Sequence, residues 1–271
     1  MASSVAQVSP VLLALAAGLF TWGMTAVGAA TVLVGRSPSQ RALDTLLGFS
    51  AGVMLAASYW SLLAPSVAMT VGTGTPTWIP PVVGFGMGGL GLWALDNVLP
   101  HIHSAGRGRE FTEGMATRWS RSTLLVLAIT LHNIPEGLAL GVAIGAAAGA
   151  KGASLYGAAI ALAVGLGLQN LPEGLAVAAP LRREGRSRGR SFFFGQLSGI
   201  VEPFAAVMGA ALVGLSTAIL PYALAFAAGA MVYVVIEEFV PECHRSGHSD
   251  VAVLAALLGF MVMTALDLAL G

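Results

Sequence analysis

The sequence predicts an all-α integral membrane protein with eight transmembrane helices. Three observations indicate this fold: the chain is 56% hydrophobic, only 10% of its 271 residues are charged, and its mean hydropathy is +0.82. A soluble domain carries about 25% charged residues, so this chain lacks the polar surface that a soluble globule needs. Its 13 basic and 13 acidic residues balance, which gives no sign of nucleic-acid binding.

Apolar stretches of about 20 residues, long enough to cross a bilayer, occur along the whole chain. Residues 45–95 carry no charge and exceed one span, but a Gly/Thr/Pro segment at 71–81 divides them. A second break, at 214–221, divides the later apolar stretch. We therefore assign residues 1–271 to one transmembrane domain. Its predicted helices are about 10–34, 44–67, 80–99, 122–149, 153–181, 191–213, 220–240 and 250–270.

The basic residues test this helix count, because they gather in alternate loops. Lys151 alone falls in an even-numbered loop. The positive-inside rule makes the odd-numbered loops cytoplasmic, so both termini are expected outside the cell. The excess of arginine over lysine hints at a bacterial genome, and we expect a bacterial inner membrane. The residues of the odd-numbered loops are Arg36, Arg41, Arg107, Arg109, Arg118, Arg121, Arg182, Arg183, Arg186, Arg188, Arg190 and Arg245.

One polar motif occurs twice inside the predicted spans, as HNIPEG at residues 132–137 and as QNLPEG at residues 169–174. Positions i, i+3 and i+4 share a helix face, so each copy presents an imidazole or amide, a second amide and a carboxylate on one side. Ionisable groups within hydrocarbon are costly and mark a functional path. The duplication therefore predicts a site between the two helices.

Three glutamates from three helices are expected at one depth. Glu136 and Glu173 lie near the middle of their spans, and Glu202 is the single charge in 191–213. No lysine or arginine lies inside any span, and an unpaired charge there costs several kcal/mol. Protonation or a bound cation must compensate, and an oxygen-rich set with an imidazole suits a divalent transition metal.

The two prolines of the motif support a transport path. Pro135 and Pro172 lack an N–H, which frees the carbonyls of Leu131 and Leu168 and bends each helix. Irregular backbone at membrane depth is tolerated where it lines a cavity. Consecutive helices run antiparallel, so the motif copies are related by an axis in the membrane plane. Such inverted repeats with a site at their interface are typical of secondary transporters.

The paired motifs, with Glu202-Pro203 in the next helix and EEFVPECHR at residues 237–245, resemble the ZIP family of metal transporters. Residues 195–203, GQLSGIVEP, resemble its GufA-type branch. The resemblance implies an inverted 3+2+3 arrangement of the eight helices. It also implies import of divalent ions into the cytoplasm, with Zn²⁺ as the expected cargo and Cd²⁺, Fe²⁺ and Mn²⁺ as competing ones.

The resemblance further implies two neighbouring metal sites that share Glu136 and Glu173. The first would add Met54, His132 and Gln169, although Met54 alone would also suit simple packing. The second would add Asn133, Asn170 and Glu202. Some relatives carry Asp where this chain has Asn170, which weakens the second site by one negative charge.

A further polar cluster is expected at the cytoplasmic end, either as an exit path for the metal or as a solvated membrane-edge face. His244 and His248 are spaced to share a helix face, while Asp44 and Asp267 read as helix caps or interfacial residues. The candidates for the exit path are Asp96, His101, His103, Glu237 and His244.

Sequence motifs separate a transporter from other classes. No GxxxxGK[ST] motif is present, so we expect gradient-driven transport by alternating access. No HExxH motif is present, which argues against the alternative of an intramembrane metallohydrolase and for a non-enzyme without a resident cofactor. A passive metal channel stays a second alternative. The expected partners are divalent metal ions and lipid, with a homodimer left open.

Overall fold

The computed structural model describes residues 9–34, 38–98, 101–105, 109–113, 121–150, 153–245 and 247–270. Almost all of these residues are helical, and short 3-10 or π segments interrupt several of the helices. The long elements are α2 (Pro10–Val34), α3 (Gln40–Ala57), α5 (Ile79–Val98), α6 (Arg121–Ala150), α7 (Ala153–Arg183), α8 (Arg188–Leu197), α9 (Val201–Leu215), α10 (Leu220–Val234) and α12 (Ser249–Leu270). The short ones are η1 (Ser58–Leu63), α4 (Ala64–Thr70), η2 (Ser198–Ile200), η3 (Thr217–Ile219), η4 (Val235–Phe239) and α11 (Val240–Arg245).

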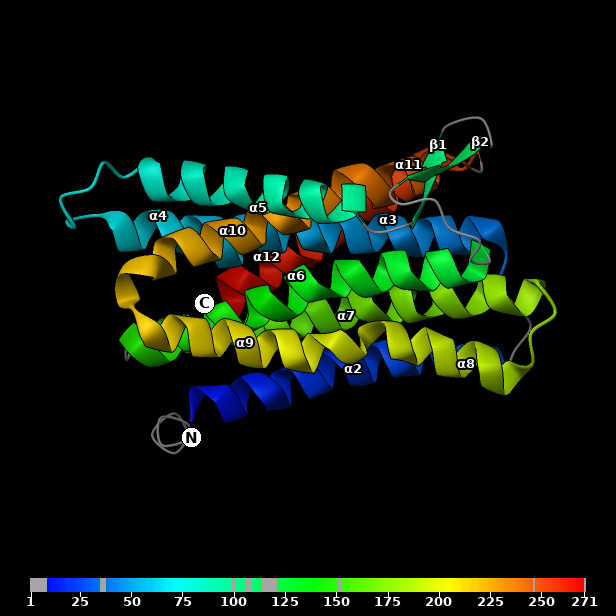
Figure 1. Ribbon diagram of the computed structural model, residues 1–271, viewed down its shortest axis with the longest axis horizontal. Coiled ribbons are helices and arrows are strands. Elements are labelled where there is room, and N and C mark those ends of the chain that lie inside the picture. The colour runs from blue at the N-terminus through cyan, green and yellow to red at the C-terminus, as the bar shows by residue number, and fades with distance from the viewer. Residues whose placement is uncertain are drawn as a thin grey trace.

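The all-α membrane fold predicted from the sequence is confirmed. Six helices within the described residues are long and apolar enough to cross a membrane, and α5 and α6 run alongside them (Figure 1). One feature was not predicted. The connection expected to be a polar loop contains an antiparallel hairpin, in which β1 (His101–Ala105) pairs with β2 (Arg109–Glu113).

The helices pack as two groups whose contacts mirror each other. In one group, α2 packs mainly on α7, and α6 packs mainly on α9. In the other, α3 packs mainly on α12, and α5 packs mainly on α10. When the first three spans are matched in order to the last three, and α6 to α7, each contact corresponds to another one. The α2–α7 contact corresponds to the α9–α6 contact, and the α3–α12 contact corresponds to the α10–α5 contact. The packing is therefore the one that an inverted 3+2+3 repeat requires.

A second mirrored feature is the position of the π segments. The span α3–η1–α4 widens at Ser58–Leu63, and its counterpart α10–η4–α11 widens at Val235–Phe239. Single π turns inside α-helices commonly mark functional sites, because they turn side chains out of the regular helical register. Here they lie in the two spans that face the motif-bearing helices α7 and α6 across the molecule.

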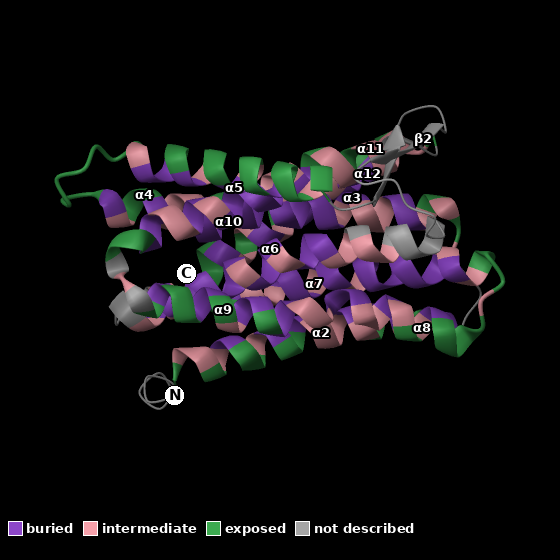
Figure 2. Cartoon of the chain, in the orientation of Figure 1, coloured by how far each residue is buried: buried purple, intermediate pink, exposed green. Residues whose placement is uncertain are grey.

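Buried residues concentrate on the central helices. Figure 2 shows α6, α7 and α10 largely buried, while α5 and α2 present exposed residues on their outer sides. Apart from Asp250 in its first turn, the exposed positions on α12 are apolar, as a lipid-facing surface requires. α2 begins and α12 ends toward one end of the bundle, and the turn between α7 and α8 lies at the other (Figure 1). That turn and the helix ends beside it carry five of the arginines, and the turn contains Gly185 at φ 84.

Candidate metal centre

The duplicated motif lies within the two adjacent central helices. α6 and α7 pack against each other, and each contains its motif proline, Pro135 or Pro172, inside the helix. A proline leaves the carbonyl four residues earlier without its helical donor, so each helix carries irregular backbone at the motif. All eight side chains expected to bind metal are buried: Met54, His132, Asn133, Glu136, Gln169, Asn170, Glu173 and Glu202.

Glycine lets the motif helices approach their partners at the site. A Cβ on Gly137 would stand 2.5 Å from the carbonyl oxygen of Glu202, so only glycine permits this contact between α6 and α9. Gly174 lies in the same way against the carbonyl oxygen of Thr25, between α7 and α2. The two contacts mirror each other across the repeat. They place the glutamate that precedes each glycine beside the partner helix.

The motif glutamates have no hydrogen-bond partners among the described residues. Both carboxylate oxygens of Glu136 and of Glu173 are unpartnered. Gln169 approaches Glu136, but neither atom of its side-chain amide reaches hydrogen-bonding geometry with a described residue. The Glu136 carboxylate is repelled by Glu173 and Glu202, which shows that the three groups converge. No lysine or arginine is among the described residues that are buried, so compensation comes either from protonation or from a cation outside the chain.

The donor set fits a divalent ion only if amides take part. No three His, Cys, Asp or Glu side chains of the described residues lie close enough to hold a metal by themselves. However, the amide oxygens of Asn133, Gln169 and Asn170 are also buried without a donor. These oxygens and the two motif carboxylates are hard or borderline ligands, and His132 adds an imidazole. The combination suits a transition-metal ion that is bound weakly enough to dissociate.

Met54 belongs to the face of α3 that meets α7. Ser50 lies one helical turn before it and donates from Oγ to the carbonyl oxygen of Gln169 at 3.0 Å. Positions i and i+4 share a helix face, so Met54 lies on the side of α3 that faces the motif helix. Its side chain is fully buried, and η1 begins four residues later, where Ser58 Oγ donates to the Met54 carbonyl at 2.7 Å.

The two motif asparagines are oriented in the same way. Asn133 Nδ2 donates to the carbonyl oxygen of Ser198 at 2.9 Å, and Asn170 Nδ2 donates to that of Thr21 at 3.1 Å. Thr21 and Ser198 are equivalent positions, since each hydroxyl in turn donates to the carbonyl three residues earlier. Each asparagine thus donates from its amide nitrogen to the partner helix, and its Oδ1 is left without a donor.

Glu202 differs from the motif glutamates because its oxygens have partners. Asn170 Nδ2 donates to Oε2 at 2.8 Å, and Thr25 Oγ1 lies 3.4 Å from Oε1. Thr25 follows Thr21 by four residues, as Glu202 follows Ser198. The two halves of the site therefore differ in two places, with histidine against glutamine in the motif and threonine against glutamate on the partner helix. The sequence analysis missed the α2 hydroxyls, which no motif marks.

Glu238 makes a second contact at the site, and no motif spacing singled it out. Its Oε1 lies 3.7 Å from Nε2 of His132, within ion-pair distance. Glu238 belongs to η4, so the π segment brings this carboxylate to the motif helix. Because a π turn shifts side chains out of the regular helical register, α-helical spacing alone could not have assigned this neighbour.

The candidates for a cytoplasmic exit are only partly described. Asp96 accepts a hydrogen bond from Tyr233 Oη at 3.2 Å, which joins α5 to α10. Glu237 is half-buried on η4. His101 and His103 lie on β1 and His244 on α11, but their side chains lie outside the described residues. Gly247, at φ 77, turns the chain between α11 and α12. His244 lies on α11 and His248 lies in the turn before α12, so the expectation of one shared helix face is wrong.

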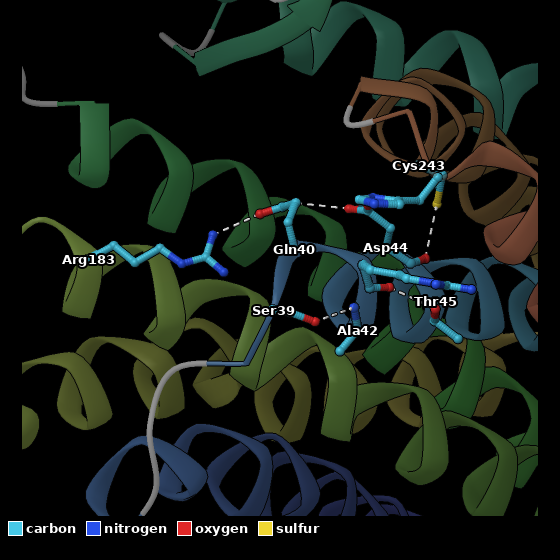
Figure 3. A network of polar contacts seen from close by, with 9 residues as sticks. Ser39, Gln40, Ala42, Asp44, Thr45, Arg183 and Cys243 are labelled. Carbon is cyan, nitrogen blue, oxygen red and sulfur yellow. Dashed lines mark hydrogen bonds and ion pairs between the residues drawn. The ribbon is translucent and has the colours of Figure 1, made fainter.

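Asp44 forms a buried polar network at the same end (Figure 3). Its side chain is fully buried, Gln40 Nε2 donates to Oδ1 at 2.8 Å, and His248 Nδ1 lies 3.0 Å from Oδ2. Cys243 Sγ lies 3.8 Å from the Asp44 carbonyl oxygen, and Arg183 at the end of α7 donates to Gln40 Oε1 at 2.7 Å. Asp44 is therefore neither a cap nor an interfacial residue but joins the ends of several helices.

The helix-end expectation for Asp267 is also corrected. Ser39 caps α3, accepting from the Ala42 amide at 3.3 Å. Asp267 is buried, and both of its oxygens accept from Ser61 Oγ, at 3.1 and 2.9 Å. Position near a helix end suggested a cap or a wet membrane edge in both aspartates. The packing of α12 on α3–η1 encloses Asp267 instead.

Known proteins are similar to this chain over nearly its whole length. A family model described as ZIP Zinc transporter matches residues 106–267. The zinc transporter ZIP11 of Bos taurus is 42% identical over 337 residues, which covers 97% of this chain and 98% of the relative. The zinc transporter GufA of Myxococcus xanthus is 38% identical, covering 95% and 98%. The zinc transporter ZIPB of Bordetella bronchiseptica is 39% identical, covering 94% and 80%.

Proposed function

The chain belongs to the ZIP family of zinc transporters, and from this premise we propose that it is a secondary transporter that moves Zn²⁺ into the cytoplasm through the candidate metal centre. One observation supports this proposal above the others. Glu136 and Glu173, one from each motif copy, are buried beside each other with no donor on either carboxylate among the described residues. A passing divalent cation supplies the missing compensation.

The ligands of the cargo follow from the donors that face the site. Glu136 and Glu173 carry the charge, while His132 and Met54 provide the softer imidazole and thioether donors that favour zinc over magnesium or calcium. Gln169 completes the set with an amide. The names of the relatives, all zinc transporters, support zinc as the cargo. Cd²⁺, Fe²⁺ and Mn²⁺ share enough of this ligand preference to compete.

The arginine-rich end of the bundle supports the proposed direction of transport. The turn between α7 and α8 and the helix ends beside it, which carry five arginines, face the cytoplasm by the positive-inside rule. The start of α2 and the end of α12 then face outward. Asp96, Glu237 and Glu238 belong to the arginine-rich half of the scaffold helices, where carboxylates attract a departing cation. In a bacterium, this is import across the inner membrane.

Alternating access requires one group of helices to move against the other. The motif residues of α6 and α7 lie in the group with α2 and α9, while Met54 lies in the group with α3, α5, α10 and α12. The site is thus divided between the two groups, so relative movement opens one ligand shell and releases the ion. No step of covalent chemistry is needed, and we assign no enzymatic activity.

Uptake into proteoliposomes tests this function and separates a carrier from a channel. We expect zinc uptake by the purified protein to saturate with zinc concentration and to be reduced by Cd²⁺, Fe²⁺ or Mn²⁺. Uptake that rises linearly without saturation would assign a passive channel instead. No uptake above empty liposomes, from protein shown to be folded and correctly inserted, would contradict both.

A further inference from the structure

We propose that Glu202 is a positioning residue that aims Asn170 at the cargo, and that the site holds one Zn²⁺ at a time. This inference rests on the proposed function, and it concerns the number of ions and the role of each carboxylate. The observation behind it is a difference in hydrogen bonding. The motif glutamates have none among the described residues, whereas Glu202 accepts from Asn170 at 2.8 Å and has Thr25 beside its other oxygen.

The amide of Asn170 fixes its own orientation. Its Nδ2 contacts two groups that can only accept, the Thr21 carbonyl oxygen at 3.1 Å and the Glu202 carboxylate at 2.8 Å. An amide nitrogen carries two hydrogens, so both are used, and the reversed amide would set oxygen against oxygen. Asn170 Oδ1 is therefore turned away from both acceptors. It is buried without a donor, as is the Oδ1 of Asn133.

The mirrored half of the site shows what Glu202 adds. Asn133 has the equivalent bond to the Ser198 carbonyl oxygen, but the residue equivalent to Glu202 on its side is Thr25. The inverted repeat therefore provides one carboxylate on the partner helices, on the Asn170 side. A carboxylate that already accepts a hydrogen bond from an amide does not need a metal ion beside it, in contrast to the unpartnered oxygens of Glu136 and Glu173.

The balance of charge between the glutamates and the metal also supports one bound ion. One Zn²⁺ balances the two charges of Glu136 and Glu173, and hydrogen bonds with Asn170 and Thr25 stabilise the charge of Glu202. A second ion would bring the total to +4 against −3 from the three glutamates in a medium of low dielectric constant, where the imbalance is costly. An aspartate in place of Asn170 would change this balance. It would lose both amide hydrogen bonds and set two carboxylates against each other, which a second cation would then bridge.

Two substitutions of Glu202 separate a positioning residue from a metal ligand. Glu202→Gln keeps an oxygen that accepts from Asn170 but removes the charge, whereas Glu202→Ala removes the acceptor. Zinc stoichiometry and affinity are measured on the purified full-length protein by equilibrium dialysis and by competition with a chromophoric chelator. Asn170→Asp is measured beside them. Glu136→Gln and Glu173→Gln serve as controls for the site itself.

The inference predicts one Zn²⁺ per chain in the parent and in Glu202→Gln, with affinities within about threefold. Glu202→Ala should bind zinc about 10–100-fold more weakly, the usual cost of removing an outer partner of a ligand. Asn170→Asp should bind two ions. Two ions in the parent and one in Glu202→Gln would overturn the inference and leave the proposed function intact. Zinc binding unchanged in Glu136→Gln and Glu173→Gln would overturn both.

Discussion

Gly137 lies against the backbone of Glu202, where a Cβ would stand 2.5 Å from the carbonyl oxygen. Gly174 has the same relationship with Thr25 on the other side of the repeat. Because these glycines directly follow Glu136 and Glu173, a close approach between helices and a candidate metal ligand occupy consecutive positions in each motif. Helix packing and the assembly of the site are therefore coupled in this protein.

Replacing Gly137 with alanine should destabilise the protein. The added methyl group overlaps backbone, which cannot move aside as a flexible side chain can, and overpacking of this kind costs about 1–3 kcal/mol. Thermal unfolding of the purified protein in detergent measures the effect. Gly23→Ala in α2 is the matched control, since a Cβ there meets nothing within 4 Å. Equal melting temperatures for the two variants would contradict the close approach of α6 and α9.

Glu238→Ala should weaken zinc binding while the protein stays folded. The Glu238 carboxylate lies 3.7 Å from Nε2 of His132, and an acceptor beside one ring nitrogen holds the histidine so that the other can bind metal. Removing such a partner typically costs 10–100-fold in metal affinity. Chelator competition measures this change, with the exposed Glu184→Ala as control. Zinc affinity equal to the parent's would remove Glu238 from the site.

Asp44→Ala should lower the stability of the protein by about 1–3 kcal/mol, because it leaves the part-buried Gln40 and His248 without their acceptor. Asp44→Asn keeps one acceptor oxygen and should lose less. Chemical unfolding in detergent distinguishes the two variants. The exposed Asp250→Ala supplies the control. If Asp44→Ala unfolds at the same denaturant concentration as this control, the network contributes nothing to stability.

Hydropathy and the duplicated motif were sufficient to predict the helices and the centre of the site. A lipid environment demands long apolar helices, so the sequence carries a strong signal for each span. Six of the predicted first residues agree with the observed helix starts to within one residue, at Pro10, Ile79, Arg121, Ala153, Leu220 and Ser249. The burial of Glu136 and Glu173 was predicted from their positions near the middle of their spans.

The residues whose roles could not be predicted from the sequence owe those roles to contacts between distant segments of the chain. Asp44 and Asp267 lie near helix ends, yet neighbouring helices bury both, and nothing local in the sequence reports that. Glu238 reaches His132 from a π segment, which an α-helical spacing rule cannot place. In the sequence Thr25 is an ordinary polar residue, and only the inverted repeat shows that it occupies the position equivalent to Glu202. These features belong to the tertiary fold and have no sequence motif of their own.

The central claim is that Glu136 and Glu173 carry the ion, and zinc uptake by Glu136→Gln and Glu173→Gln in proteoliposomes tests it most directly. Each substitution keeps the size of the side chain and removes one of two buried charges that repel each other. Melting temperatures of the metal-free variants should therefore equal or exceed that of the parent. We predict that zinc uptake falls at least about tenfold in both variants, since each loses a charged ligand. Uptake at the parent's rate by either folded variant would contradict the account.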